Sequence, residues 1–430
     1  MTIMSTEGPS SKPGFSTVLH RPDFLRLWIG QVVSNVGTGI SSLALLFFAY
    51  YLTQSPLSMA ILAMVRVIPV VIFSSFIGVY VDRLDRRMIM VASDVTRTIL
   101  ILLIPLSIYF PQNIPTIYWV YLLTFLYASA DAWFYPARNA ALPNLVEGEE
   151  LVTANSLSQM TFQIIQLVIP PVGGILIAVL APDYLPAFAI NSVAFILSAI
   201  SLSGIRTSLK PIRDDTVKEP MLRQIKDGAS IVIQNAVLSF IFVFSILLAI
   251  SSGVLNALLL PYLDGFLGLS AAQIGLIMGL GSGGGIVTAL YLGKKSEMKT
   301  PLNLISLAGI MAGVSVLVFS LASGFMTVLI PWIAIASVDV LLDIPLSVLM
   351  QELVADDMRG RVFALLSIAF TTFQVIGMGF GGVWAEVIDS EVIPIFASGL
   401  GFLLVSIFAV AYQKRVHLNE RLSIMLSTSS

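Results

Sequence analysis

Twelve long apolar segments, separated by short polar breaks, dominate this chain and leave few folds open to it. A helix needs ~20 apolar residues to cross ~30 Å of hydrocarbon, and lipid offers no partners for backbone polar groups. The segments are continuously apolar and do not alternate, which argues against a transmembrane barrel. We therefore predict an all-α integral membrane protein with transmembrane helices at residues 27–52, 58–81, 88–110, 116–137, 153–181, 184–205, 233–263, 271–293, 301–323, 326–350, 361–387 and 391–412.

The basic residues support both the number of segments and their orientation. Of the 23 Lys and Arg residues, all except Arg66 and Arg97 fall on one side of this twelve-segment arrangement, and the connections on the other side carry none. Loops rich in Lys and Arg remain in the cytoplasm. We therefore predict a multi-pass protein of a prokaryotic-type plasma (inner) membrane with both termini in the cytoplasm.

The composition excludes several classes of protein. With 57% hydrophobic and 11% charged residues, a chain of 430 residues has too little polar surface for a water-soluble globule. It contains no Cys, and its two His residues, His20 and His417, lie in polar tails. We therefore expect neither disulfides nor a metal site. No nucleophile, base and orienting residue stand together, so we predict that the chain is not an enzyme.

The sequence gives no sign of nucleotide binding. Gly279, Gly281 and Gly284 match the spacing of a dinucleotide fingerprint, but no strand precedes them, so we interpret them as helix-packing residues. No phosphate-binding loop of the Gly-x-x-x-x-Gly-Lys type is present. We expect a monomer without cofactor that is driven by a proton gradient. Its expected partners are the lipid bilayer and a small-molecule substrate, with no nucleotide or nucleic acid among them.

A long basic connection divides the chain into two sets of six segments. The expected parts are a cytoplasmic tail (1–23), an N-terminal half (24–206), a cytoplasmic linker (207–232), a C-terminal half (233–413) and a second tail (414–430). Within the linker, residues 219–230 are predicted to form either an interfacial helix or a solvated loop.

The two halves show a weak internal repeat. A shift of 208 positions aligns Asp131 with Asp339, Gln166 with Gln374, and the pair Gly173-Gly174 with Gly381-Gly382. Many secondary transporters build two halves in this way around a site at the membrane midplane. The repeat agrees with the division into six and six segments.

The connection between the second and third segments carries a recognisable motif, Gly78-Val-Tyr-Val-Asp82-Arg83-Leu-Asp85-Arg86-Arg87. It resembles the major facilitator superfamily signature Gly-x-x-x-Asp-Arg-x-Gly-Arg-Arg/Lys, with Asp85 in the place of a Gly. We expect a tight turn after Gly78 and a contact between Asp82 and the N-terminus of the eleventh helix, whose dipole favours an anion. This contact would form a conformational gate made of Gly78, Asp82, Arg83, Arg86, Arg87, Arg138, Arg359 and Arg361.

Further motifs resemble one group within that superfamily, the third drug:proton antiporter group, which includes macrolide-efflux proteins and the enterobactin exporter. They are Tyr135-Pro-Ala-Arg138-Asn-Ala-Ala-Leu-Pro143, the stretch that opens the first segment at Phe24, and Ser93-Asp94-x-x-Arg97. The stretch Pro170-Pro171-Val-Gly173-Gly174 is similar to the antiporter motif Gly-Pro-x-x-Gly-Gly, with Ile169 replacing its first Gly. Small residues and proline suit a hinge between rocking halves.

Charges inside the membrane are costly and point to pairing or to a water-filled cavity. Asp94, Arg97 and Asp131 share one depth, so they form either a structural ion cluster or, with Asp131 as proton carrier, part of the coupling machinery. Asp339 and Asp343 lie four residues apart on one helix face, far from basic residues in the sequence. They are predicted to couple protons or bind a cation; the alternatives are cavity lining and a gate contact.

Arg66 lies deep in its segment, with no acidic residue at its level. It either snorkels outward or faces the cavity, where it would meet an anionic group of the substrate or a distant acid. Trp133, Phe134 and Phe48 are predicted to bind the substrate, on the expectation that the first, fourth, seventh and tenth helices line the cavity. The other predicted substrate-binding residues are Gln166 and Gln374, which the internal repeat aligns with each other.

The sequence therefore predicts a secondary transporter of the major facilitator type that works by alternating access. The favoured function is proton-coupled efflux of amphipathic drugs or hydrophobic natural products. The alternative is export of a siderophore or of an anionic, lipid-like solute, and a membrane-embedded receptor or enzyme has less support.

Overall fold

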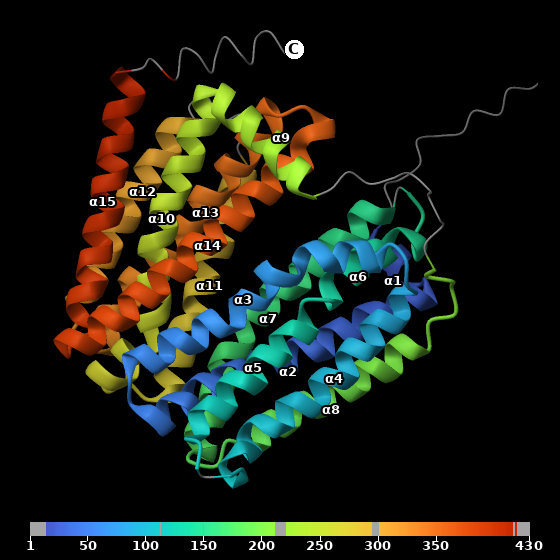
Figure 1. The fold of residues 1–430 in the computed structure, drawn as a ribbon. Coiled ribbons are helices and arrows are strands. Elements are labelled where there is room, and N and C mark those ends of the chain that lie inside the picture. Colours follow the sequence, from blue (N-terminus) through green and yellow to red (C-terminus); the bar gives the residue numbers. More distant parts are fainter. Residues whose placement is uncertain are drawn as a thin grey trace, which may run out of the picture.

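The computed structural model describes residues 14–111, 113–148, 150–210, 221–294 and 301–415, together with Leu418. Its N-terminal half contains α1 (Phe15–Leu19), α2 (Pro22–Thr53), α3 (Pro56–Val81), α4 (Arg86–Leu106), η1 (Ser107–Tyr109), α5 (Thr116–Asp131), α6 (Phe134–Ala141), η2 (Leu142–Asn144), α7 (Glu150–Leu180) and α8 (Leu185–Ser203) (Figure 1). Its C-terminal half contains α9 (Met221–Gln234), α10 (Ala236–Leu260), η3 (Pro261–Phe266), α11 (Ala271–Gly293), α12 (Pro301–Ser320), α13 (Phe325–Leu353), α14 (Asp356–Ile388) and α15 (Val392–Arg415). The predicted all-α membrane fold is confirmed.

Eleven helices of the described chain are long and apolar enough to cross a membrane. They coincide with eleven of the twelve predicted segments. The fourth segment, predicted as one helix over 116–137, is divided: α5 ends at Asp131 after 16 residues, and α6 begins at Phe134. The sequence did not reveal this break, because Ala132 and Trp133 fit a helix by composition.

The helix ends are fixed by local sequence. Pro56 occupies the first turn of α3, and the hydroxyl of Ser55 accepts a hydrogen bond from the Ser58 amide at 3.2 Å. The side chain of Asn235 caps α10, and Ser270 forms a capping box at the start of α11. These caps satisfy the free amides of helix N-termini and so permit short connections between long helices.

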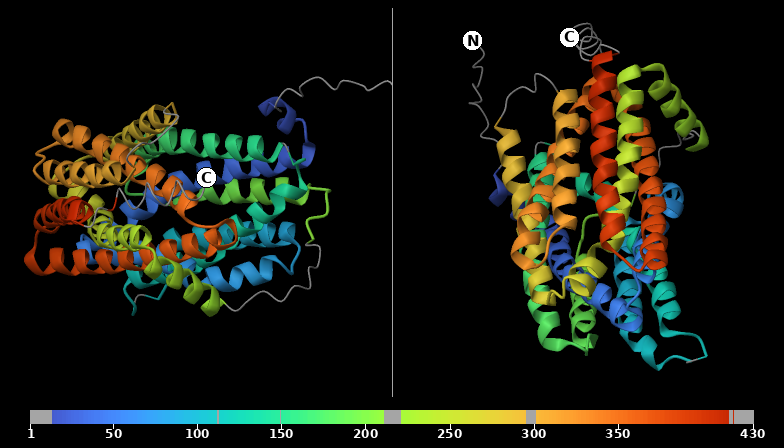
Figure 2. Two further views of the ribbon diagram at one scale, coloured as in Figure 1. Left: turned by 90° about the horizontal axis from the view of Figure 1, so that it is seen from above. Right: turned by 90° about the vertical axis from the view of Figure 1, so that its left-hand side faces the viewer.

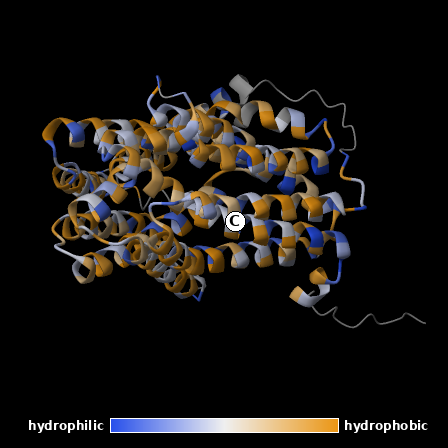
Figure 3. Ribbon diagram, turned by 90° about the horizontal axis from the view of Figure 1, so that it is seen from below, coloured by the Kyte–Doolittle hydropathy of each residue, from blue (hydrophilic) through white to orange (hydrophobic). Residues whose placement is uncertain are grey.

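The two ends of the bundle differ in charge. We call the end where α2 and α7 begin the basic end, because the predicted basic connections lie there. The other end is called the acidic end, because Asp183, Asp264, Glu386, Asp389 and Glu391 lie at its connections. Hydrophobic residues predominate along the helices between them (Figure 3).

The halves touch toward the acidic end. Gly382 of α14 packs on Ala60 and Leu57 of α3, and the Ser55 hydroxyl donates to Glu386 at 2.8 Å. Gly174 of α7 packs on Ala271 and Gly275 of α11. From these contacts the halves diverge toward the basic end (Figures 1 and 2).

The interface follows the internal repeat. Gly174 and Gly382 are 208 positions apart, and each packs against the opposite half. Gly173 and Gly381, also 208 apart, pack inside their own halves, against α2 at Leu43 and against α10 at Val254. The weak sequence repeat therefore marks structurally equivalent positions in the two halves.

The linker region contains the helix α9, which settles the choice between helix and loop for the part from 221 onward. Gly228 packs on the Arg361 backbone of α14, with an added Cβ only 3.2 Å from its carbonyl oxygen. Arg361 also pairs with Asp227 at 2.8 Å. Residues 1–13, 211–220, 295–300, 416–417 and 419–430, which include His417 and most of both predicted tails, lie outside the described residues.

Candidate functional site

A central cavity of about 390 Å³ lies between the halves, close to their contact. Its walls come from α2, α3, α10, η3 and α11, and they are apolar apart from Arg66 and Asn256. The Arg66 guanidinium donates to the Ser42 hydroxyl at 3.1 Å. Arg66 therefore faces the cavity between the halves and does not snorkel outward.

The expected aromatic lining of this cavity is wrong. Phe48 is buried against Tyr184 and Phe188 of α8, with ring centroids 5.9 and 6.2 Å away. Phe134 is buried beneath Arg97. Trp133 lines a shallow groove between α4 and α5 and packs on Tyr80. The first and seventh predicted helices, α2 and α10, do line the cavity, but α3 and α11 stand in place of the fourth and tenth, so these rings fill spaces inside one half.

Asp94, Arg97 and Asp131 form one ion cluster inside the N-terminal half. Arg97 pairs with Asp94, its neighbour on α4, and with Asp131 at the end of α5, where the Nη1 to Oδ1 distance is 2.5 Å. The rings of Phe134 and Phe195 lie 4.7 and 4.4 Å from the guanidinium carbon. The cluster ties α4, α5 and α8 together, as expected for its structural interpretation.

Asp339 and Asp343 lie in a different environment. Both side chains are exposed in a pocket of about 470 Å³ between α10, α13 and α14. Aromatic rings from Phe244, Phe363, Phe370 and Phe402 share this pocket with Gln374, whose amide lies 3.5 Å from the Ser252 hydroxyl. Within the described part of the chain, no Lys or Arg forms an ion pair with either carboxylate.

The N-terminal half has a pocket of its own, of about 450 Å³, between α2, α6 and α7. Arg138 lies in its wall, buried to 7% exposure, among Trp28, Gln31, Asn35 and Gln159. Gln166 is exposed on α7 two turns beyond Gln159 on the same helix face. In this pocket the predicted gate residue Arg138 therefore lies beside polar side chains of α2 and α7 that were not predicted as site residues.

The turn expected directly after Gly78 is not formed. The helix α3 continues to Val81, and the Asp82 amide donates to the Gly78 carbonyl at 3.2 Å. An added Cβ at Gly78 would meet no atom within 4 Å. Asp85, which replaces a Gly of the family signature, caps α4 by accepting a hydrogen bond from the Arg87 amide at 2.9 Å.

Three other predicted gate arginines donate hydrogen bonds to carbonyl groups of their own halves. Arg86 donates to the Ala140 carbonyl at 3.0 Å, and Arg87 donates to the Ile205 carbonyl at 2.7 Å. In the C-terminal half, Arg359 donates to the Gln351 carbonyl. Arg83 is exposed beside them at the end of α3. The predicted gate residues thus come from both halves, at the end where the halves diverge (Figure 1).

The predicted hinge lies at the contact of α7 with α11. Both Pro170 and Pro171 lie inside α7, and the Pro170 carbonyl touches Gly275. Gly279 packs on Pro171, and Gly281 and Gly284 pack on Trp332 and Ile333 of α13. These contacts agree with the interpretation of Gly279, Gly281 and Gly284 as helix-packing residues.

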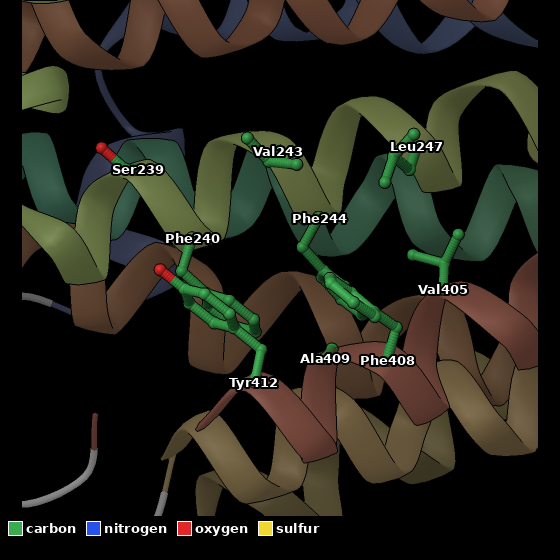
Figure 4. Close-up of a pocket in the computed structure, with 9 residues that line it drawn as sticks. All are labelled: Ser239, Phe240, Val243, Phe244, Leu247, Val405, Phe408, Ala409 and Tyr412. Carbon is green, nitrogen blue, oxygen red and sulfur yellow. The ribbon is translucent and has the colours of Figure 1, made fainter. Parts of the chain in front are cut away.

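A further groove of about 240 Å³ lies between α10 and α15, outside the interface (Figure 4). The rings of Phe240 and Tyr412 stack there at 6.0 Å and 3°, and Phe244 stacks on Phe240. Its lining is apolar except for the hydroxyls of Ser239 and Tyr412. Such an apolar surface is suited to contact with lipid tails.

The sequence profile of the Major Facilitator Superfamily matches residues 27–371. The chain belongs to the Major Facilitator Superfamily. It is therefore a multi-pass secondary transporter of a small molecule, and not an enzyme. The resemblance drawn from the motif at Gly78 and its neighbours is confirmed.

Relatives in this superfamily have similar lengths. Macrolide efflux protein A of Streptococcus pyogenes is 26% identical over 375 residues, covering 84% of this chain and 89% of that protein. BacE of Bacillus amyloliquefaciens, named only provisionally as a bacilysin exporter, is 28% identical over 418 residues. The match covers 94% of this chain and 98% of that protein. A bacterial homologue of the iron transporter ferroportin, solved in an inward-facing state, shares the fold with a TM-score of 0.71 at 17% identity, over 91% and 98% of the chains.

Sequence reasoning missed several residues of this major facilitator protein. Asn256 lines the central cavity, and Trp28, Gln31 and Asn35 line the N-terminal pocket. A signal for the last three was present, because their spacing of three and four places them on one helix face inside an apolar segment. Asn256 had no such partner, and only the packing of α10 shows that it faces the cavity.

Proposed function

We propose that this protein is a proton-coupled exporter of amphipathic drugs or hydrophobic natural products, and that both termini lie in the cytoplasm. The basic end would then face the cytoplasm, in line with the positive-inside rule. The halves diverge at that end and touch at the other, so the conformation would be open to the cytoplasm. Export is also the direction named for macrolide efflux protein A.

The observation that carries the proposal is the pair Asp339 and Asp343 in its aromatic pocket. Two carboxylates four residues apart, with no described basic residue paired to either, repel each other when both are charged. A proton or a cationic substrate relieves this repulsion. Because both would use the same pair, binding of one favours release of the other, and this competition is a mechanism for exchange.

The central cavity supplies the second requirement of such an exporter. Its walls are apolar residues such as Leu43, Met59 and Leu260, which suit the hydrophobic body of a substrate. Asp131 is less suited to carry the coupled proton because it is held by Arg97 in a structural cluster. We therefore place proton coupling on the pair in α13.

The proposal is tested with purified protein in proteoliposomes and a macrolide such as erythromycin. We expect an imposed pH gradient to drive accumulation, and Asp339→Asn to lower it about tenfold or more while exchange without a gradient persists. Asp389→Asn, which removes a carboxylate at the acidic end, is the matched control and is expected to transport normally. Equal accumulation with and without the gradient would refute proton coupling.

A second candidate is export of a siderophore or another anionic, lipid-like solute. Arg66 favours it, since this guanidinium is the one charged group in the described lining of the apolar central cavity. Binding of a fatty acid and of the corresponding alkylamine separates the candidates. If Arg66→Gln weakens binding of the acid alone, the anionic solute is supported; equal losses for both ligands contradict it.

A further inference from the structure

The pocket around Arg138 and the pocket around Asp343 occupy equivalent places in the two halves. The first lies between α2, α6 and α7, and the second mainly between α10, α13 and α14. Six of the seven α6 and α7 residues in the first pocket have a counterpart 208 positions later in the second. The pairs include Tyr135 with Asp343, Arg138 with Leu346, Asn155 with Phe363, and Phe162 with Phe370.

The N-terminal pocket has the properties of an anion site. Arg138 is its one charged lining residue within the described chain, and this residue is buried to 7% exposure. Its Nη1 group donates to the neighbouring Asn139 at 2.9 Å, whereas Nε and Nη2 have no hydrogen-bond partner among the described residues. A buried guanidinium with unused donors is costly unless an anion or another acceptor reaches it.

The surrounding side chains are suited to the same task. Gln31, Asn35, Asn155 and Gln159 contribute amide groups to the wall, and no acidic residue of the described chain lines it. The Trp28 indole is fixed by donating to the Thr161 hydroxyl at 3.2 Å. A planar carboxylate can accept two parallel hydrogen bonds from a guanidinium, so this group fits the pocket.

The C-terminal pocket carries the opposite charge, and it does so at a different position of the repeat. Leu346 stands where Arg138 stands in the first half, and Asp343 stands where Tyr135 does. Aromatic rings from Phe363 and Phe370 line the pocket beside the carboxylates. Carboxylates with nearby aromatic faces are the recognition elements for an ammonium group.

We propose that the transported substrate carries both charges, and that its carboxylate binds at Arg138 and its ammonium group at Asp343. This inference rests on the proposed exporter function and narrows its substrate class to amphipathic zwitterions. Each half would hold one end of the molecule, at the basic end of the transport path. Arrival of the ammonium group would displace the proton from the acidic pair, which links binding to coupling.

The test compares three ligands that share one apolar chain: ω-aminoundecanoic acid, its methyl ester and its N-acetyl derivative. Binding is measured as thermal stabilisation of the wild-type protein in detergent, since a ligand of the folded state raises its stability by mass action. We expect the free amino acid to bind about tenfold or more tightly than either derivative. Equal binding of the three ligands would overturn the proposal.

Two variants assign the charges to their pockets. Arg138→Gln is expected to abolish the difference between acid and ester while preserving the difference between amine and N-acetyl derivative, and Asp343→Asn is expected to do the reverse. Arg415→Gln and Asp389→Asn, matched changes of charge outside the pockets, should leave both differences intact. If Arg138→Gln weakens acid and ester alike, Arg138 has a structural role, such as pairing with a carboxylate of the other half, and the proposal is wrong.

Transport of erythromycin by the same protein separates this inference from the exporter function. Gradient-driven efflux of erythromycin, together with equal binding of acid and ester, would overturn the zwitterion site and leave the exporter standing. Selective binding of the free amino acid without any effect of the gradient would support the two pockets and refute proton coupling.

Discussion

At the scale of single residues, the ion cluster of Asp94, Arg97 and Asp131 is a stability element. Asp94 is fully buried and Arg97 is 4% exposed, so loss of the guanidinium leaves carboxylates without their cation. We expect Arg97→Gln to destabilise the protein by ~3–5 kcal/mol, measured by thermal unfolding in detergent. The double change of Arg97→Gln with Asp94→Asn should recover part of this loss. An unchanged melting temperature for Arg97→Gln would contradict the structural role.

Residue types and spacing predicted which charges lie inside the membrane, and Asp94 and Arg97 do pair as neighbours on one helix face. They could not predict on which side of a helix an aromatic ring is buried. Phe134 belongs to an expected cavity helix, yet its ring packs on the Arg97 guanidinium and shields this group from solvent. For Arg66, only the packing of α2 beside α3 decides between snorkelling and the cavity.

At the scale of helices, the contact of α7 with α11 depends on small residues. An added Cβ at Gly174 would overlap the Ala271 carbonyl oxygen, whereas one at Gly293, at the end of α11, would meet no atom within 4 Å. We expect Gly174→Val to separate the halves and to lower transport about tenfold or more, with Gly293→Val close to wild type. Measurement of both variants in proteoliposomes at matched expression checks this. Normal transport by Gly174→Val would show that the close contact is dispensable.

The helices themselves could be predicted almost completely, because a membrane-spanning segment is defined by its own length and apolarity. The exceptions lie where tertiary contacts decide. The short helix α1 is held beside α7, where Arg21 pairs with Glu147 at 2.5 Å and with Glu150 at 3.2 Å. The break after Asp131 places this carboxylate against Arg97, a contact between helices that no local pattern encodes.

At the scale of the whole molecule, the position of the contacts predicts how the transporter can be locked. Because the chain has no native Cys, a thiol reagent reacts only with Cys residues that are introduced. The substitutions Ser55→Cys and Glu386→Cys replace two side chains that lie 2.8 Å apart. We expect a short bifunctional thiol reagent to join the pair in the resting protein and to abolish transport. Single-Cys variants should stay active after the same treatment. Active cross-linked protein would show that the acidic end need not open.

If the halves rotate about their off-centre contact, this contact is a fulcrum with arms of unequal length. From Gly174 to the start of α7, and from Gly382 to the start of α14, the arms measure about 35–40 Å, at 1.5 Å per residue. The four residues from Gly382 to Glu386 form an arm of about 6 Å. With arms of these lengths, which follow from the helix rise, a rotation of about 10° would move the basic end by ~6 Å and the acidic end by only ~1 Å. A close contact of small residues near the acidic end would therefore let a small rotation produce a wide opening at the basic end.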